Sequence, residues 1–154
     1  LEEGGKLDVL LEECDSLNIK ILSRVKARAL GIPVVMDTSD RGMVDVERFD
    51  LDKNLPLLHG KCAVTSMEEF EKMAPEEQMQ LMMAIVDFDK LSDRMKFSFG
   101  ELGKSLSTWP QLATDVISGG GNAAKVARMI VLGEDVPSKR YYFDVSDRIK
   151  NSNG

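Results

Sequence analysis

The chain has 154 residues, of which 43% are hydrophobic and 30% charged, and its formal net charge is -6. These values are typical of one folded globular domain, and the negative charge argues against nucleic acid or an anionic membrane surface as the main partner. The two cysteines, Cys14 and Cys62, exclude a disulfide scaffold or a four-cysteine zinc site within the chain and fit a reduced, cytoplasmic protein, while no apolar run approaches the roughly 20 residues that span a bilayer.

The first predicted elements are a strand, a helix and a second strand. Residues 9–11 form a short apolar run that is typical of a strand covered on both faces. Residues 16–30 have helical periodicity and end before Gly31, and "IPVVM" (32–36) is a second apolar run. The expected apolar stripe of the helix holds Leu17, Ile21, Leu22, Val25 and Ala29, and its polar side holds Lys20, Arg24, Lys26 and Arg28. This βαβ order predicts two parallel strands joined by a right-handed crossover.

After residue 36 the elements become shorter. "DTSDRG" (37–42) predicts a turn, residues 43–49 alternate as in a half-exposed strand, and residues 50–61 have the composition of a loop. Helices are predicted at 66–73, where Ser66 and Glu69 form a capping box, at 75–86 after Pro75, at 93–102 after Ser92, and from Pro110 to about Leu132. "RYYFDV" (140–145) is the last predicted strand, and residues 151–154 are a tail. The predicted fold class is α/β.

Three carboxylates stand where the first strand meets the helix. The segment "EECDS" (12–16) places Glu12, Glu13 and Asp15 directly before the helical stretch. Asp15 or Ser16 can cap the helix, which stabilises it by about 1 kcal/mol. Alternatively, Asp15 lies at the rim of a sheet, where open α/β folds bind nucleotides and where a carboxylate can hold magnesium. The residues alone leave both readings open.

Two long segments of the chain resemble one known family. "LDVLLEECDSLNIKILSRVKARALGIPVVM" and "STWPQLATDVISGGGNAAKVARMIVLGE", followed by "RYYFDV", are similar to the second half of the ThiF/MoeB and ubiquitin-activating-enzyme-like superfamily. The resemblance is greatest to bacterial ThiF-like proteins, some of them fused to a nitroreductase-like flavin domain. It implies that residues 1–150 are the C-terminal portion of a Rossmann-like ThiF domain. It also implies a homodimer that uses ATP and magnesium to adenylate a carboxylate, typically the C-terminus of a ubiquitin-like or sulfur-carrier protein.

The resemblance carries over to few individual residues. Asp15 matches the family's aspartate that faces magnesium and the triphosphate, Ser16 replaces an asparagine beside it, and Lys20 replaces an arginine. The family's glycine-rich phosphate loop, its other ATP-holding residues and its zinc CxxC pairs have no counterpart in these residues. Because "LEEGG" (1–5) reads as the last turn of a helix with a glycine stop, we expect the chain to be the C-terminal part of a larger protein and to be inactive alone.

Three further features have more than one reading. Cys62, in the "HGKC" loop, lies where some relatives place a catalytic cysteine, whose thiol pKa Lys61 or His59 would have to lower; otherwise it is an incidental thiol packed under a loop. Cys14, at the end of the strand, is predicted to lie in the core. The three glycines of "SGGGN" (118–122) interrupt a good helix and indicate either close packing or backbone amides that meet a phosphate or flavin.

Charged side chains also follow the second strand. This cluster contains Asp37, Asp40, Arg41 and Asp45. It would lie at the same sheet edge as Asp15, so that a site is conceivable, although a turn is the better reading. Trp109, directly before Pro110, is predicted to be a packed anchor at the entry of the last long helix.

Three functions are consistent with the sequence. The first is one half of the ATP-dependent adenylating enzyme described above. The second is a non-catalytic ThiF-derived dimerisation or docking module, for example for a flavin nitroreductase-like domain, and the third is half of a nicotinamide-binding Rossmann protein. ATP–pyrophosphate exchange would support the first, a stable dimer that binds no nucleotide the second, and NADH binding the third.

Overall fold

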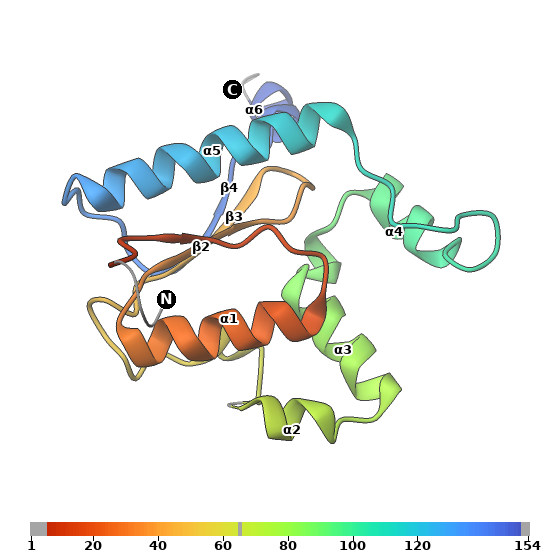
Figure 1. The fold of residues 1–154 in the computed structure, drawn as a ribbon. Helices are drawn as coiled ribbons and strands as arrows, with labels where there is room; N and C mark the ends of the chain where they lie inside the picture. Colours follow the sequence, from red (N-terminus) through yellow and green to blue (C-terminus); the bar gives the residue numbers. More distant parts are fainter. Residues whose placement is uncertain (1–5, 65, 152–154) are drawn as a thin grey trace.

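The computed structural model describes residues 6–64 and 66–151 (Figure 1). In chain order its elements are β1 (Leu10–Leu11), α1 (Leu17–Leu30), β2 (Val34–Asp37), β3 (Met43–Glu47), the 3₁₀ turn η1 (Leu57–Gly60), α2 (Met67–Glu71), α3 (Pro75–Ile85), the 3₁₀ turn η2 (Phe88–Lys90), α4 (Asp93–Gly100), α5 (Ala113–Val131), β4 (Lys139–Tyr142) and α6 (Val145–Asn151). The four strands form one mixed sheet in the order β1-β2-β3-β4. The predicted α/β class is therefore confirmed.

The predicted βαβ unit is present at the start of the sheet. β1 and β2 are parallel, with Leu10 opposite Val34 and Leu11 opposite Val35. α1 connects them and ends at Gly31, whose left-handed backbone (φ 68°) lets its amide donate to the carbonyls of Ala27 and Arg28. β1 was expected to be covered on both faces, but it is an edge strand of two residues in the described part of the chain, and Leu11 is 46% exposed.

The rest of the sheet is antiparallel, since β3 pairs in this way with both β2 and β4. The prediction that β3 is half-exposed was wrong, because all five of its residues are buried. Val44 and Val46 pack under α5, while Asp45 and Glu47 point to the other face and are paired there with buried cations. Acidic residues on a strand therefore do not imply that the strand is exposed to solvent, because cations from other elements can pair with them in the core.

The sheet lies between two layers of helix (Figure 1). α1 covers one face, and Ile21, Met36 and Phe49 belong to the core on that side. α5 covers the other face, where Val35 and Ala123 belong to a second core. Neighbouring residues of β2 thus contribute to opposite cores, as the pleat of a strand requires.

α1 buries a different face from the one predicted. Leu22 and Ala29 were assigned to the buried stripe, yet both are exposed. Arg24 was assigned to the polar side, yet it is 0% exposed. Its guanidinium lies 2.6 Å from carboxylate oxygens of both Glu12 and Glu47, and these ion pairs explain why a charged residue occupies the core side.

The starts of the middle helices agree with their local signals. Ser66 accepts a hydrogen bond from the amide of Glu69, Pro75 is the first residue of α3, and Ser92 accepts from the amide of Met95. α5 begins at Ala113 rather than at Pro110, and α6 was not predicted. The expected final turn at 1–5 and most of the expected tail lie outside the described residues. Within the described residues, none of the helices has the length and apolar character needed to cross a bilayer.

Candidate functional site

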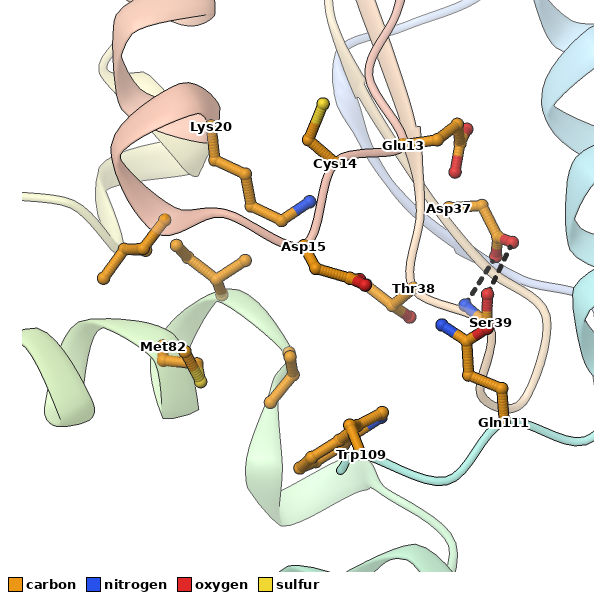
Figure 2. A pocket seen from close by; sticks show the side chains of 13 residues that line it. Glu13, Cys14, Asp15, Lys20, Asp37, Thr38, Ser39, Met82, Trp109 and Gln111 are labelled. Atoms are coloured by element: carbon orange, nitrogen blue, oxygen red, sulfur yellow. Dashed lines mark hydrogen bonds between the residues drawn. The ribbon is translucent and has the colours of Figure 1, made fainter. Parts of the chain in front are cut away.

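A cavity of about 330 Å³ opens at the carboxyl ends of the parallel strands β1 and β2 (Figure 2). Its polar side is formed by Glu13, Asp15, Lys20, Asp37, Thr38 and Ser39. Its apolar side is formed by Leu17, Met82, Ile85, Val86 and Trp109. We call it the strand-end cavity. Its position is the one at which open α/β sheets bind their ligands.

Asp15 reaches the strand-end cavity from the bend between β1 and α1 (Figure 2). Among the described residues, no side chain or backbone group forms a hydrogen bond or ion pair with its carboxylate. Ser16 is the N-cap residue of α1, but its side chain makes no capping hydrogen bond and donates to the side-chain oxygen of Asn18 instead. Ser16 therefore holds the predicted N-cap position without the predicted capping bond, and Asp15 does not cap the helix but lines the cavity. Ser16 itself does not line the cavity.

Glu12, the first residue after β1, is buried and has several polar partners. It is 3% exposed and accepts a hydrogen bond from the backbone amide of Cys14 at 2.8 Å. The same carboxylate lies 2.6 Å from Nη1 of Arg24, and both of its oxygens lie 3.2 Å from Nζ of Lys20. These bonds fix the bend that carries Asp15. They also neutralise Lys20, the cation that the sequence assigned to nucleotide binding.

Two further carboxylates flank Asp15, one from each strand end. Glu13 is exposed as a residue, but its carboxyl group is partly desolvated beside the sheet, and this raises the pKa of Glu13 from 4.5 to about 7, with the negative charge of Asp37 as the next cause. Asp37 is 7% exposed and accepts a hydrogen bond from the backbone amide of Ser39 at 3.0 Å. Burial raises the pKa of Asp37 above its ordinary value. The polar side of the strand-end cavity therefore carries more negative than positive charge.

α5 approaches the back of Asp37 very closely. A Cβ atom added to Gly119 would lie 2.0 Å from Oδ2 of Asp37, so that the Asp37 side chain or α5 would have to move. Gly120 and Gly121 face open space. Of the two readings of the glycine run, close packing is confirmed for Gly119, and its partner is a residue of the strand-end cavity.

Trp109 closes the side of the strand-end cavity opposite the strand ends (Figure 2). Its ring meets Phe99 edge-on at a centroid distance of 5.4 Å, and Phe99 meets Phe88 in the same way at 5.3 Å. Trp109 is thus packed against neighbouring rings, as predicted, and it also lines the strand-end cavity, which was not predicted. Its place in the site was missed because residues 87–112 reach the sheet through tertiary packing that no local pattern encodes.

The remaining candidates lie elsewhere. Cys62 is buried, its thiol donates to the carbonyl of Val64 at 3.4 Å, and burial raises its thiol pKa, which is the opposite of what a nucleophile needs. Cys14 was predicted to be buried but is exposed, because the chain leaves the sheet immediately after Glu12. His59 lies 3.1 Å from Asp45 on β3.

Of the charged cluster after β2, only Asp37 belongs to the strand-end cavity. Asp40 accepts hydrogen bonds from the backbone and hydroxyl of Ser92, and Arg41 pairs with Asp144 near α6. Asp45 is buried between His59 and Arg140. Asp40 and Arg41 do follow the carboxyl end of β2, and residues 39–42 form the predicted turn. Of the four residues only Asp37 belongs to the candidate site, and the other three hold other elements together.

The fit of a magnesium ion can be tested on the donors present. Within the described residues, no group of three or more His, Cys, Asp or Glu side chains is arranged to hold a metal ion. Magnesium, however, commonly uses one or two carboxylates and completes its shell with water and phosphate oxygens. Thr38 adds a second indication, because this residue lines the strand-end cavity and its buried hydroxyl finds no hydrogen-bond partner in the described structure. The donor set fits a magnesium–phosphate complex and does not fit an all-protein metal cage.

The chain is similar to one curated protein of unknown activity. It is 41% identical over 140 residues to an uncharacterized protein of Mycobacterium tuberculosis. The aligned part covers 91% of this chain and 20% of that protein, so the chain spans about a fifth of the length of the relative. No family model and no solved structure matches the chain. The function must therefore be argued from the site.

Proposed function

We propose that the chain forms the magnesium and phosphate side of an ATP-dependent adenylating enzyme, as the ThiF-like resemblance implies. The observation that carries the proposal is Asp15. It stands at the carboxyl end of a parallel strand, lines a cavity, and has no partner among the described residues. A carboxylate that makes no structural contact and faces a cavity is a candidate ligand for a cation.

The charge of the strand-end cavity supports a metal-bound phosphate rather than a free one. Asp15, Glu13 and Asp37 supply carboxylates, whereas Lys20 is already paired with Glu12. A free triphosphate would be repelled by these groups, but its magnesium complex would satisfy Asp15 and reach the free hydroxyl of Thr38. Magnesium would supply charge neutralisation on the pyrophosphate that leaves. The N-terminus of α1, directly after Asp15, adds partial positive charge for the same phosphates.

The other half of the nucleotide site is proposed to come from a part of the protein that precedes this chain in sequence. The outer edge of β1 is not paired by any strand in the described residues, so a further strand with its glycine loop can be added there. We accordingly propose that the chain alone does not catalyse adenylation. We also propose that the larger protein of which it is a part, here called the parent, is a homodimer acting on a carboxylate. The C-terminus of a ubiquitin-like or sulfur-carrier protein is the substrate class that the resemblance suggests.

The test is ATP–pyrophosphate exchange by the full-length parent. Asp15→Asn should lower the exchange rate on the order of 100-fold, because it removes the charge that binds magnesium at the reacting phosphates. Glu68→Gln is the matched control, since Glu68 is an exposed acid on α2 whose partner is the equally exposed Lys72. Its rate should not change.

Other outcomes would replace the proposal. A parent that shows no exchange with any carboxylate, forms a stable dimer and binds no nucleotide would be a docking module. Binding of NADH in place of ATP would indicate a nicotinamide-dependent protein. Exchange that is unchanged by Asp15→Asn would remove Asp15 from the site.

A further inference from the structure

The proposed nucleotide role leaves half of the strand-end cavity unexplained. Phosphate and magnesium need polar groups, yet the cavity is also lined by the apolar side chains of Leu17, Met82, Ile85, Val86 and Trp109. Trp109 is only partly buried, although indole is among the most costly side chains to leave in contact with water. An apolar wall of this kind suits an organic group rather than phosphate.

The charge across from that wall is negative and not compensated. Asp15 has no partner in the described structure, and Glu13 and Asp37 repel each other. The nearest cation, Lys20, is bound by both oxygens of Glu12 at 3.2 Å. Carboxylates on one side and an indole on the other are the two features that recognise organic cations, through ion pairing and cation–π attraction.

We propose that the strand-end cavity binds a small organic ammonium ion, whose charged nitrogen faces Asp15 and Glu13 and whose apolar body lies against Trp109 and Met82. The rigid placement of the indole supports this site. The edge-on contacts between Phe88, Phe99 and Trp109 hold the ring in place before a ligand arrives, which lowers the entropy lost on binding.

Resting on the proposed function, this ammonium ion is the acceptor of the activated carboxylate, and it occupies the strand-end cavity after magnesium pyrophosphate has left Asp15. A carboxylate of the cavity takes a proton from the ammonium group, and the freed nitrogen lone pair attacks the carbonyl carbon of the acyl adenylate. The new C–N bond forms as the bond between the carbonyl carbon and the phosphate oxygen breaks, and AMP leaves with that electron pair. The nitrogen then loses its second proton to water, which leaves a neutral amide.

The binding step can be measured on this chain by fluorescence, because Trp109 is its single tryptophan. We would titrate the chain at pH 8 with phenethylammonium, with the neutral isostere 2-phenylethanol, and with the anion 3-phenylpropionate. Phenethylammonium should change the emission saturably and bind about tenfold tighter than the alcohol, while the anion should not bind. Thermal unfolding with each probe provides a second readout, as a ligand of the folded state raises the melting temperature.

Variants locate the binding. Asp15→Asn should weaken phenethylammonium about tenfold and leave the weak binding of 2-phenylethanol unchanged, and Glu68→Gln should change neither. Equal affinities for the ammonium ion and the alcohol would overturn the proposal and leave a purely apolar pocket. No saturable change with phenethylammonium would overturn it as well.

The same fluorescence titration, together with the exchange assay, distinguishes a failure of this inference from a failure of the proposed function. Magnesium pyrophosphate that perturbs Trp109 while phenethylammonium does not would retain the phosphate site and reject the amine. Phenethylammonium binding in a parent that catalyses no ATP–pyrophosphate exchange would retain the ammonium site and reject adenylation.

Discussion

The bend between β1 and α1 carries carboxylates in three different states. Glu12 is buried and fully paired, Asp15 faces the cavity without a partner in the described structure, and Glu13 stands between these extremes. The three acids of this one bend thus provide a buried partner for two cations, a candidate metal ligand and a group that titrates near neutral pH. Adjacent acids acquire different roles because the bend turns their side chains toward different surroundings.

Glu13 makes the stability of the protein depend on pH. Its pKa rises from 4.5 to about 7 on folding, so the folded state binds the proton more tightly than the unfolded state. The stability that the protonated carboxyl provides is therefore complete below pH 4.5 and is lost as the pH rises to about 7. Glu13→Gln, which mimics the protonated form, should match the wild type near pH 4 and exceed its melting temperature at pH 8.

Thermal unfolding of both proteins at several pH values would measure this difference. Glu76→Gln, at an exposed acid in the first turn of α3, is the control and should show no such growing advantage. An advantage of Glu13→Gln that is constant between pH 4 and pH 8 would contradict the prediction.

Among the elements, those marked by local signals could be predicted from the sequence. Ser66, Pro75 and Ser92 start their helices as expected, and Gly31 ends α1. α6 was missed although its signal is present: Asp144 accepts hydrogen bonds from the amides of Ser146 and Asp147, as a capping residue does. That aspartate had been assigned to the preceding strand.

The burial of charged residues could not be predicted in the same way. Arg24 reads as a surface residue by helical periodicity, and its burial depends on Glu12 and Glu47, which come from two other elements. The residues of the strand-end cavity show the same difference between local signals and tertiary packing. Asp15 could be found from the order of strand and helix, whereas Trp109 reaches the cavity only through the packing of Phe88 and Phe99.

The Arg24 ion pairs should contribute strongly to stability. Arg24→Ala leaves Glu47 buried without its cation and leaves Glu12 with Lys20 alone, and breaking buried pairs of this type costs about 3–5 kcal/mol. Arg28→Ala, on the same helix but partly exposed, should cost less than about 1 kcal/mol. Denaturant unfolding measures both. A loss for Arg24→Ala as small as that for Arg28→Ala would mean that water replaces the guanidinium.

α5 offers a matched pair of glycines for testing its contact with Asp37. Gly119→Ala should destabilise the protein, because its Cβ would lie 2.0 Å from Oδ2 of Asp37. Gly120→Ala meets open space in the same helix and should stabilise it by about 0.8–1 kcal/mol through helix propensity. The free energies of unfolding should thus change in opposite directions. Stabilisation by both substitutions would show that α5 can move away from the sheet.

On the scale of the whole molecule, the strand-end cavity lies where two parts of the structure meet. The sheet supplies its acids, and residues 82–111, which include α4 standing apart from the sheet, supply most of its apolar wall (Figure 1). The attachment of α4 passes through the turn after β2. There Asp40 accepts hydrogen bonds from the backbone and hydroxyl of Ser92, and Arg41 donates to the carbonyl of Lys90 at 2.9 Å. The turn that carries Asp37 therefore also holds the wall that faces it.

Breaking this attachment should increase the local unfolding of the segment that forms the apolar side of the cavity more than that of the sheet. Asp40→Ala removes both hydrogen bonds to Ser92, and losing a buried charged acceptor of this kind costs about 1–3 kcal/mol. We expect faster amide hydrogen exchange in residues 93–112 and a red-shifted Trp109 emission, while exchange in β2 and β3 changes much less, because those strands open only with larger unfolding events. Asp89→Ala, at an exposed acid in the same segment, should leave both readouts unchanged. Equal acceleration of exchange in the sheet and in residues 93–112 would show that the two parts unfold as one unit, and that the cavity cannot open on its apolar side alone.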